Sequence, residues 1–472
     1  MPIATINPAT GETVKTFDPL DGVELDNKIE AAAVAFSGYR LTSFADRAGW
    51  MNRAADILDR RNEDIAVLMT TEMGKTLASA RAEAAKCARS CRFSAAHAEA
   101  FLADEPADPE AVGATRAYAR YEPLGPVLAI MPWNFPLWQA MRFAAPALMA
   151  GNVGLLKHAS NVPRTALFME ELFAEAGFPD GVFQTLLITS GQVEGVLRDA
   201  RVVAVTLTGS EPAGRAVAAI AGDEIKPSVL ELGGSDPFLV MPSADLEQAA
   251  KVATTARCQN NGQSCIAAKR FIVHDAIAAE FEGRFVAHMA GLRVGDPMDP
   301  ATDVGPLATE QGVDDIVGQV ADAVAKGASL LCGGQRPTGR GWYYPPTVVA
   351  GLNPGMRMFH EEVFGPVAGV YRVASLEEAI ELANATEFGL GANVWTNDQR
   401  ERDTCIRDIR SGAIFINGMT TSYPELPFGG VKRSGYGREL SAHGIREFCN
   451  LKTVWVGEGI GAASAGAAGH TE

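Results

Sequence analysis

The sequence has few of the features that mark membrane proteins, disulfide-linked proteins of oxidising compartments or nucleic-acid-binding proteins. Its seven cysteines are an odd, scattered set in a chain of 472 residues, which argues against a disulfide framework and favours a reducing cytoplasm. No apolar run reaches the roughly eighteen residues of a membrane span, and no basic stretch leads into an apolar one at the start. With 41 basic against 57 acidic side chains, the formal charge of −16 repels polyanions. We therefore expect a cytoplasmic protein with no membrane or nucleic-acid partner that acts on a small molecule.

The length and the hydrophobic pattern predict an α/β protein of more than one domain. At 472 residues and 47% hydrophobic content, the chain is long enough for two or three cores. Two long helices are expected at residues 46–69 and 76–101. The next segments alternate, with strands at residues 127–131, 152–157, 182–187 and 202–207 and helices at residues 137–149, 163–176 and 194–199. This alternation predicts a parallel, doubly wound sheet, and similar alternation continues from residue 234 to about residue 450.

One cysteine has the surroundings of a nucleophile. Cys265 follows polar amides and Gly262 and precedes three small apolar residues, a pattern typical of a tight turn that leads a thiol out of a packed layer. Only a thiolate attacks carbon, so such a residue needs a base or a positive dipole nearby. A lone cysteine is otherwise often an inert core residue. Cys87 and Cys91 stand four apart on a predicted helix without His or Cys partners, so helix packing is favoured over a metal site and no metal is expected.

Several loops follow predicted strands, where open α/β sheets bind ligands. The loop at residues 132–136 follows one strand, and Lys157 ends the next. The turn at residues 208–210 opens a helix whose free backbone N–H groups and dipole could hold a phosphate. The usual G-x-G-x-x-G signature is absent, and such a turn often only reverses the chain.

Taken together, six motifs resemble the aldehyde dehydrogenase superfamily, in the family's order and over almost the whole chain. They are Pro132–Pro136, Thr208–Ser210, Glu231–Gly234, Gly262–Cys265, Glu362–Pro366 and Pro427–Gly430. At residues 156–160, 230–236 and 422–427 the chain is most similar to bacterial members that use NADP to oxidise succinate semialdehyde.

The resemblance implies a fold and a domain plan. A Rossmann-type parallel-sheet cofactor domain would comprise residues 1–104 and 124–232, and an α/β catalytic domain residues 233–450. Residues 105–123 and 451–458 would form a small β oligomerisation arm that builds a homodimer or homotetramer. The alternation at residues 451–456 also suits a strand inside one subunit. The Gly- and Ala-rich residues 459–472 are expected to be a flexible tail.

The resemblance also implies a reaction. Cys265 would attack the aldehyde to give a thiohemiacetal, which loses hydride to the cofactor and leaves a thioester for water to hydrolyse. Glu231 would be the general base for that water, because burial raises the pKa of a carboxyl group toward neutrality. Asn134 would stabilise the oxyanion together with the backbone N–H of Cys265. In isolation, Asn134 could instead cap a turn and Glu231 could be a solvated loop acid.

A cofactor set follows from the same resemblance, with NADP as the expected cofactor and NAD as the alternative. Many NAD-preferring relatives carry Glu at the position of Ser160, where its charge repels a 2′-phosphate. Ser160 removes that repulsion, and Lys157 adds a positive charge. Ser160 could also simply cap the following helix. The implied cofactor contacts are Trp133, Asn134, Lys157, His158, Ala159, Ser160, Gly209, Ser210, Leu232, Glu362 and Phe364.

For the substrate, the resemblance implies a small aldehyde with a carboxylate at its far end. Arg142 is the candidate to hold that carboxylate through its guanidinium fork, and Ser422 could add a hydroxyl. Gln259 replaces a second Arg found in some relatives, and Arg142 could instead merely pair with a surface acid. Ala267 stands where some relatives have a second thiol, so no disulfide with Cys265 is expected.

Three alternatives to a succinate-semialdehyde dehydrogenase stay open at this point. The enzyme could oxidise another small aldehyde, it could pass the thioester to coenzyme A, or the fold could serve as a binding protein without activity. Glu231 argues against the transfer to coenzyme A, because hydrolysis needs a base positioned for water. The presence of Cys265, Glu231 and Asn134 together argues against an inactive protein.

Overall fold

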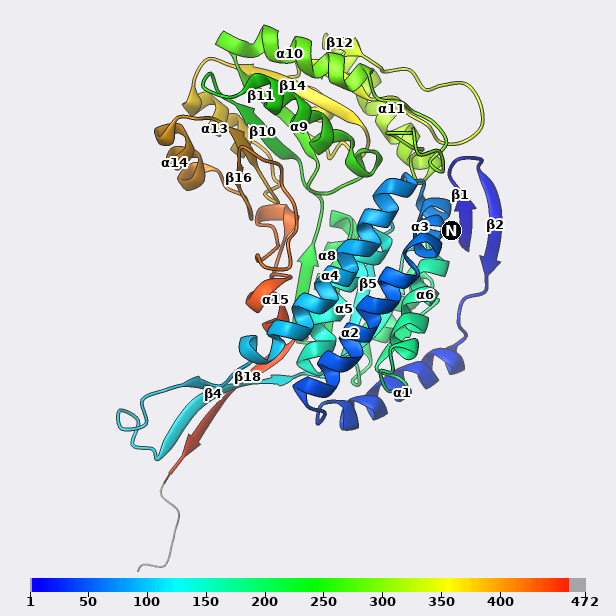
Figure 1. The fold of residues 1–472 in the computed structure, drawn as a ribbon, viewed down its shortest axis with the longest axis vertical. Coiled ribbons are helices and arrows are strands. Elements are labelled where there is room, and N and C mark those ends of the chain that lie inside the picture. Colours follow the sequence, from blue (N-terminus) through cyan, green and yellow to red (C-terminus); the bar gives the residue numbers. More distant parts are fainter. Residues whose placement is uncertain (1, 458–472) are drawn as a thin grey trace, which may run out of the picture.

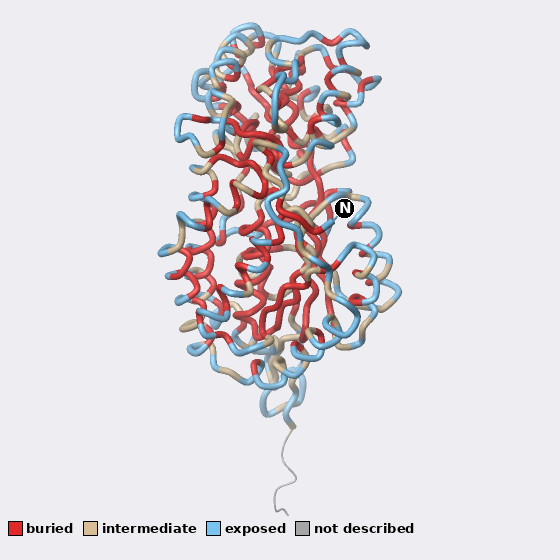
Figure 2. Tube along the Cα trace, turned by 90° about the vertical axis from the view of Figure 1, so that its right-hand side faces the viewer, coloured by how far each residue is buried: buried red, intermediate tan, exposed pale blue. Residues whose placement is uncertain are grey.

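The computed structural model describes residues 2–457 as two sheet-centred lobes with a projecting arm (Figure 1). Buried chain runs through both lobes, whereas the arm at the lower end is largely exposed (Figure 2). Within residues 2–457, none of the helices combines the length and the apolar character needed to traverse a bilayer. The tail expected at residues 459–472 lies outside the described residues.

The lower lobe is built on a six-stranded sheet that is parallel except at one edge. Its strands in spatial order are β17 (Gly435–Tyr436), β9 (Ser228–Glu231), β8 (Ala204–Thr208), β5 (Pro126–Met131), β6 (Val153–His158) and β7 (Phe183–Thr185). Only β17 runs antiparallel to its neighbour. The parallel sheet predicted from the strand–helix alternation is therefore present.

Helices cover this sheet, and α5 lies deepest among them, with all of its residues buried. It packs against α4 and against β6. The helices of this lobe are α1 (Gly22–Tyr39), α2 (Phe44–Arg60), α3 (Asn62–Met73), α4 (Leu77–Phe101), α5 (Pro136–Ala150), α6 (Pro163–Glu175), η1 (Ser190–Gln192), α7 (Val193–Arg198) and α8 (Glu211–Asp223).

The prediction of a single helix over residues 46–69 is wrong. The chain leaves helical geometry at Arg61, with φ −97° and ψ 15°, and so forms α2 and α3. Both segments keep apolar residues at helical spacing, which is why the periodicity did not reveal the break. The glycine after α3, Gly74, takes φ 80° and ends that helix in a left-handed cap.

The upper lobe is built on a seven-stranded sheet. Its strands in spatial order are β12 (Ser329–Cys332), β13 (Thr347–Ala350), β14 (Val367–Val373), β11 (Ala268–His274), β10 (Asp236–Val240), β15 (Asn393–Trp395) and β16 (Phe415–Ile416), with only β12 antiparallel to its neighbour. Its helices are α9 (Leu246–Cys258), η2 (Gln259–Gly262), α10 (Asp275–Ala290), α11 (Glu310–Ala325), α12 (Arg357–His360), α13 (Leu376–Asn384) and α14 (Gln399–Asp408).

Smaller elements complete the molecule. The arm is a three-stranded antiparallel sheet of β18 (Cys449–Val456), β4 (Arg116–Pro123) and β3 (Glu105–Pro106). A hairpin of β1 (Ile3–Asn7) and β2 (Glu12–Phe17), which the sequence did not predict, packs beside α3. The last elements are η3 (Lys432–Ser434) and α15 (Ser441–Arg446).

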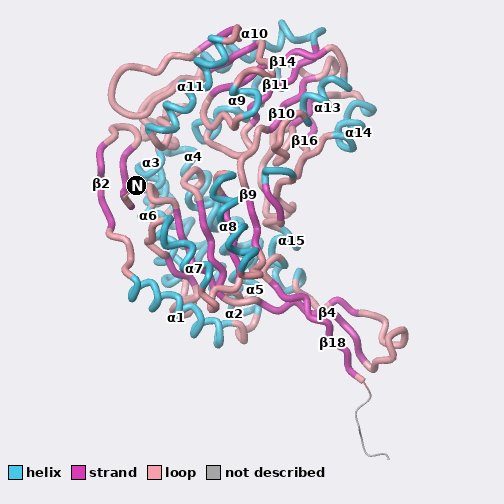
Figure 3. Tube along the Cα trace, turned by 180° about the vertical axis from the view of Figure 1, so that it is seen from behind, coloured by secondary structure: helices cyan, strands magenta, loops and turns pink. Residues whose placement is uncertain are grey.

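One short connection carries the chain from the lower sheet to the upper one. Strand β9 ends at Glu231, and β10 begins at Asp236 (Figure 3). The chain returns later, since β17 joins the lower sheet and α15 packs on α4 and α5. A segment placed by sequence in residues 233–450 thus belongs to the lower core, and the domain boundaries remain a prediction.

Candidate active site

Cys265 lies in the turn between η2 and β11. Asn260 and Asn261 adopt left-handed φ values of 55° and 58°, a conformation that Asn tolerates better than most residues. The buried ammonium of Lys269 donates to the carbonyl oxygen of Cys265 at 2.6 Å and to that of Ser264 at 2.9 Å. These contacts hold the turn, and Cys265 stays half-buried at its surface.

Two cavities meet at Cys265. One has a volume of about 250 Å³ and is lined from α4, α5 and residues 419–422. We call it the α4 cavity. The other has a volume of about 280 Å³ and is lined by the loop after β5, the start of α8 and the end of β9. We call it the α8 cavity. A nucleophile at this junction can contact ligands on both sides.

Glu231 lines the α8 cavity with Cys265, although 34 positions separate them in sequence. Within the described residues, neither carboxylate oxygen has a hydrogen-bond partner, and both are buried. Burial raises the pKa of Glu231 to about 8, reinforced by the carboxylate of Glu439 and opposed by Arg142. A buried carboxyl group without partners can accept a proton from a bound water or thiol.

The thiol of Cys265 is not ionised in advance. Burial raises its pKa to about 12, and the nearby cations Arg142 and Lys269 oppose that rise. Its proton must therefore leave during the attack, and a base has to stand close by.

Asn134 is fixed to the same turn. The side-chain nitrogen of Asn134 donates to the backbone carbonyl oxygen of Gln263 at 3.2 Å. The backbone carbonyl oxygen of Asn134 accepts from the side-chain amide of Asn260 at 2.8 Å. One N–H of the Asn134 amide is left for another acceptor, because the NH₂ group has two donors. Asn134 lines the α8 cavity beside Cys265.

The α8 cavity has features that suit a dinucleotide. Gly209 and Ser210 line it at the start of α8, and the hydroxyl of Ser210 makes no capping hydrogen bond. The free N–H groups of that helix end are left for an anion. Trp133 and Phe364 stand edge to face with their ring centroids 5.7 Å apart. Leu232 and Glu362 also line the cavity, and Lys269 holds the carboxylate of Glu362 at 3.1 Å.

Lys157 to Ser160, at the end of β6, do not line either cavity beside Cys265. Within the described residues, Lys157 forms no ion pair, and burial lowers its pKa. The two ring nitrogens of His158 are occupied by the carbonyl oxygen of Pro136 at 2.8 Å and the N–H of Ala159 at 2.9 Å. His158 is therefore bonded to the backbone, whereas Lys157 keeps an uncompensated charge.

The residues predicted to bind substrate all line the α4 cavity, namely Arg142, Gln259 and Ser422. Arg142 forms a buried ion pair with Glu439 and lies over the ring of Phe428, 4.5 Å from its centroid. Sequence analysis missed Glu439, because its partner is nearly 300 positions away and nothing in its neighbourhood in the sequence marks it.

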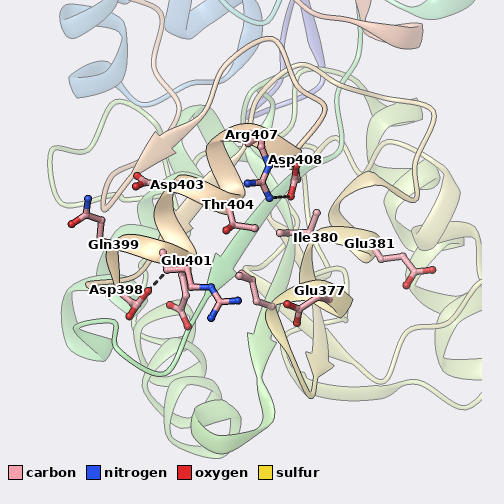
Figure 4. A pocket seen from close by; sticks show the side chains of 12 residues that line it. Glu377, Ile380, Glu381, Asp398, Gln399, Glu401, Asp403, Thr404, Arg407 and Asp408 are labelled. Carbon is pink, nitrogen blue, oxygen red and sulfur yellow. Dashed lines mark hydrogen bonds and ion pairs between the residues drawn. The ribbon is translucent and has the colours of Figure 1, made fainter.

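A larger hollow of about 1180 Å³ lies elsewhere, between α13 and α14 (Figure 4). Its wall is mostly charged, and some of its charged groups have partners nearby: Asp398 caps α14, and Arg407 pairs with Asp408 at 2.7 Å. None of its lining residues lines either cavity at Cys265. This hollow is therefore separate from the candidate site at Cys265.

Comparison with known proteins identifies the class. The chain belongs to the aldehyde dehydrogenase family, whose model matches residues 1–454. The α/β fold expected from the motifs is thereby confirmed, because solved structures of this family superpose closely on the chain.

Among individual relatives, the chain is similar to succinate-semialdehyde dehydrogenase [NADP(+)] 1 of Mycobacterium tuberculosis, with 66% identity over 456 residues, 97% of this chain and 100% of that protein. A crystal structure of succinic semialdehyde dehydrogenase from Streptococcus pyogenes with NADP+ superposes with a TM-score of 0.94 at 39% identity, covering 97% of this chain and 100% of that one. The Burkholderia pseudomallei succinate-semialdehyde dehydrogenase gives 0.94 at 35% identity, covering 97% and 95%.

Proposed function

We propose that the protein oxidises succinate semialdehyde to succinate with NADP. The observation that carries this proposal is the position of Cys265 between two cavities, with the unpartnered carboxyl group of Glu231 in one of them. The curated relatives at 66% identity are named for this substrate and this cofactor. The two cavities allow the aldehyde and the cofactor to reach the sulfur from separate sides.

In this proposal, Cys265 adds to the aldehyde carbon and Glu231 takes up the thiol proton. The charge that develops on the aldehyde oxygen is met by the free N–H of the Asn134 amide and by the backbone N–H of Cys265. One such donor is typically worth about 3 kcal/mol in the transition state. Because Gln263 and Asn260 bond Asn134, its amide needs little reorganisation when the charge forms.

NADP fits the residues of the α8 cavity and of the end of β6. Gly209, Ser210 and the α8 N-terminus would hold the diphosphate, Glu362 the nicotinamide ribose, and Lys157 and Ser160 the 2′-phosphate. A side chain at Gly233 would displace the carboxylate of Glu362 from its place in this wall of the cavity. When bound, NADP accepts the hydride that leaves the thiohemiacetal carbon.

Glu231 would pass the thiol proton to solvent and then act a second time, on the thioester. Its carboxylate removes a proton from a water that attacks the acyl carbon, and Cys265 leaves as thiolate. This role disfavours transfer to coenzyme A, since a base for water is then unnecessary. At the far end of the substrate, Arg142, Gln259 and Ser422 would contact the carboxylate in the α4 cavity.

The decisive assay follows NADPH formation from succinate semialdehyde, with and without coenzyme A. We expect turnover without coenzyme A and no acyl-coenzyme A product. Cys265→Ala should retain less than about 1% of the activity, as is typical for removal of a nucleophile. The matched control is Cys258→Ala, a buried cysteine seven positions earlier, which should keep the activity. Turnover that requires coenzyme A would refute the hydrolytic reaction.

We further propose that the protein is a cytoplasmic homodimer or homotetramer assembled through the arm. All seven cysteines are unpaired, which suits a reducing compartment. Strand β18 exposes Leu451, Trp455 and Val456 to the extent of 53%, 55% and 43%. Apolar side chains gathered on an exposed strand are typical of an interface.

A further inference from the structure

The α4 cavity contains two basic side chains, but their charges are differently compensated. Arg142 is buried and paired with buried Glu439. That pair is close to neutral as a unit, so Arg142 can offer N–H donors but little net charge. Glu83, the acidic residue that also lines the cavity, is engaged by buried Lys75 and by the N–H groups that begin α5.

Lys86, on α4, has no such partner. Among the described residues, no carboxylate lies within ion-pair distance of its ammonium. The ammonium lies over the ring of Trp138, 4.1 Å from the centroid, and donates to the hydroxyl oxygen of Ser422 at 2.8 Å. Burial and the nearby Arg142 lower the pKa of Lys86 to about 8, which reflects a cation in positive and poorly solvated surroundings.

Ser422 completes an arrangement in which the groups still free to bond are all donors. Its oxygen accepts from Lys86 and also from the indole N–H of Trp138 at 3.1 Å. A serine hydroxyl has two lone pairs and one proton, so both acceptor positions are taken and the proton remains to be donated. Within residues 2–457 that proton has no acceptor. The lysine ammonium and this hydroxyl therefore both lack an anionic partner at the cavity wall.

We infer that Lys86 is a specificity-determining residue that binds the distal carboxylate of the aldehyde, with Ser422 donating to the same group. This inference rests on the proposed function, since it assigns the charge that selects an acidic aldehyde over a neutral one. The carboxylate supplies the missing acceptor for the Ser422 proton and the missing counter-charge for Lys86. Arg142 adds donors from the other side, but its charge is already matched by Glu439.

The test measures kcat/KM for succinate semialdehyde and for butanal, a neutral aldehyde with the same number of carbons. The ratio of the two values isolates recognition of the carboxylate. In Lys86→Met the ratio should fall by about ten- to a hundredfold, the loss expected for one charge-assisted hydrogen bond. Lys86→Arg should keep most of the ratio. With butanal as substrate, the inhibition constant of succinate should rise in Lys86→Met by a similar factor.

Arg89→Met is the matched control, because it removes one positive charge from the same helix outside the cavity, where Arg89 pairs with Glu425. Its ratio should equal that of the wild type. An unchanged ratio in Lys86→Met would overturn the inference. If kcat/KM fell equally for both aldehydes, the role of Lys86 would be structural. A wild-type enzyme that does not prefer the semialdehyde over butanal would refute the proposed substrate and the inference with it, and that result is visible before any variant is made.

Discussion

Glu231 is useful as a base because burial raises the pKa of its carboxyl group. Its pKa of about 8 means that the carboxyl group mostly retains its proton at pH 7 and becomes a base as the pH rises. We expect kcat, where hydrolysis limits turnover, to rise through about pH 8 and then level off. Steady-state rates measured from about pH 6 to pH 9.5 test this.

The matched variant is Glu231→Gln, which keeps the shape but cannot accept the proton. It should slow the first burst of NADPH, because the Cys265 thiol loses its base, and it should slow the hydrolysis that follows, without the rise near pH 8. A flat wild-type profile, or a variant that turns over steadily, would show that another group activates the water.

A separate prediction at the scale of single residues concerns Ser160 and the choice between NADP and NAD. Ser160→Glu places a negative charge beside the expected 2′-phosphate and offers a partner to ribose hydroxyls. The ratio of kcat/KM for NADP to that for NAD should fall at least tenfold, about 1.4 kcal/mol. Ser160→Ala separates the loss of the hydroxyl from the added charge and should change the ratio much less. If Ser160→Glu leaves the ratio unchanged, discrimination lies elsewhere, and Lys157 is then a general ribose contact.

At the scale of elements, Glu83 fixes the start of α5. Its carboxylate accepts from the N–H groups of Leu137 at 2.9 Å and Trp138 at 2.8 Å, and it pairs with Lys75, which is fully buried. Glu83→Gln leaves the Lys75 charge without a counter-charge and should lower the free energy of unfolding by about 3 kcal/mol. Denaturant unfolding measures the change.

The double variant Glu83→Gln with Lys75→Met removes both charges of this pair and should regain most of the loss. A single variant within about 0.5 kcal/mol of wild type would mean that the pair contributes little to stability.

Elements with a local signal could be predicted from the sequence. The strands β5, β6 and β8 are short apolar runs between turns, and α4 has a clear helical period, so their positions followed from residues alone. The break at Arg61 and the β1–β2 hairpin were missed, because the first lies inside continuous periodicity and the second depends on packing against α3.

The residues of the candidate site likewise fall into those with a local signal in the sequence and those without one. Motifs located Cys265, Glu231 and Asn134, because each stands in a recognisable local pattern. Lys86 lies in an Ala-rich helix and reaches Ser422 across 336 positions. Such a contact exists only after both lobes have formed, so a single sequence gives no sign of it.

At the scale of the molecule, the arm leaves the apolar side chains Leu451, Trp455 and Val456 of β18 exposed beyond the body of the chain. Leu451→Glu places a charge on this strand opposite Tyr121 of β4 without touching either cavity. If the arm assembles subunits, this variant should shift the protein toward smaller species in sedimentation velocity. Val23→Glu is the control, since Val23 is also exposed but lies on α1. Equal sedimentation of wild type and Leu451→Glu would place the interface elsewhere.

The two cavities at Cys265 share only Cys265 itself and Gln139 among their described lining residues. Substitutions of residues that line one cavity and make no contact with the other should therefore combine as independent factors, whereas Arg142 of the α4 cavity donates to the hydroxyl of Thr208 in the α8 cavity at 3.4 Å. Aldehyde preference and cofactor preference can then be inherited, or engineered, as separate traits on one scaffold. Gln139 and Arg142 are the positions that tie the two traits together, so lineages that change either of them should be those in which both preferences changed at once.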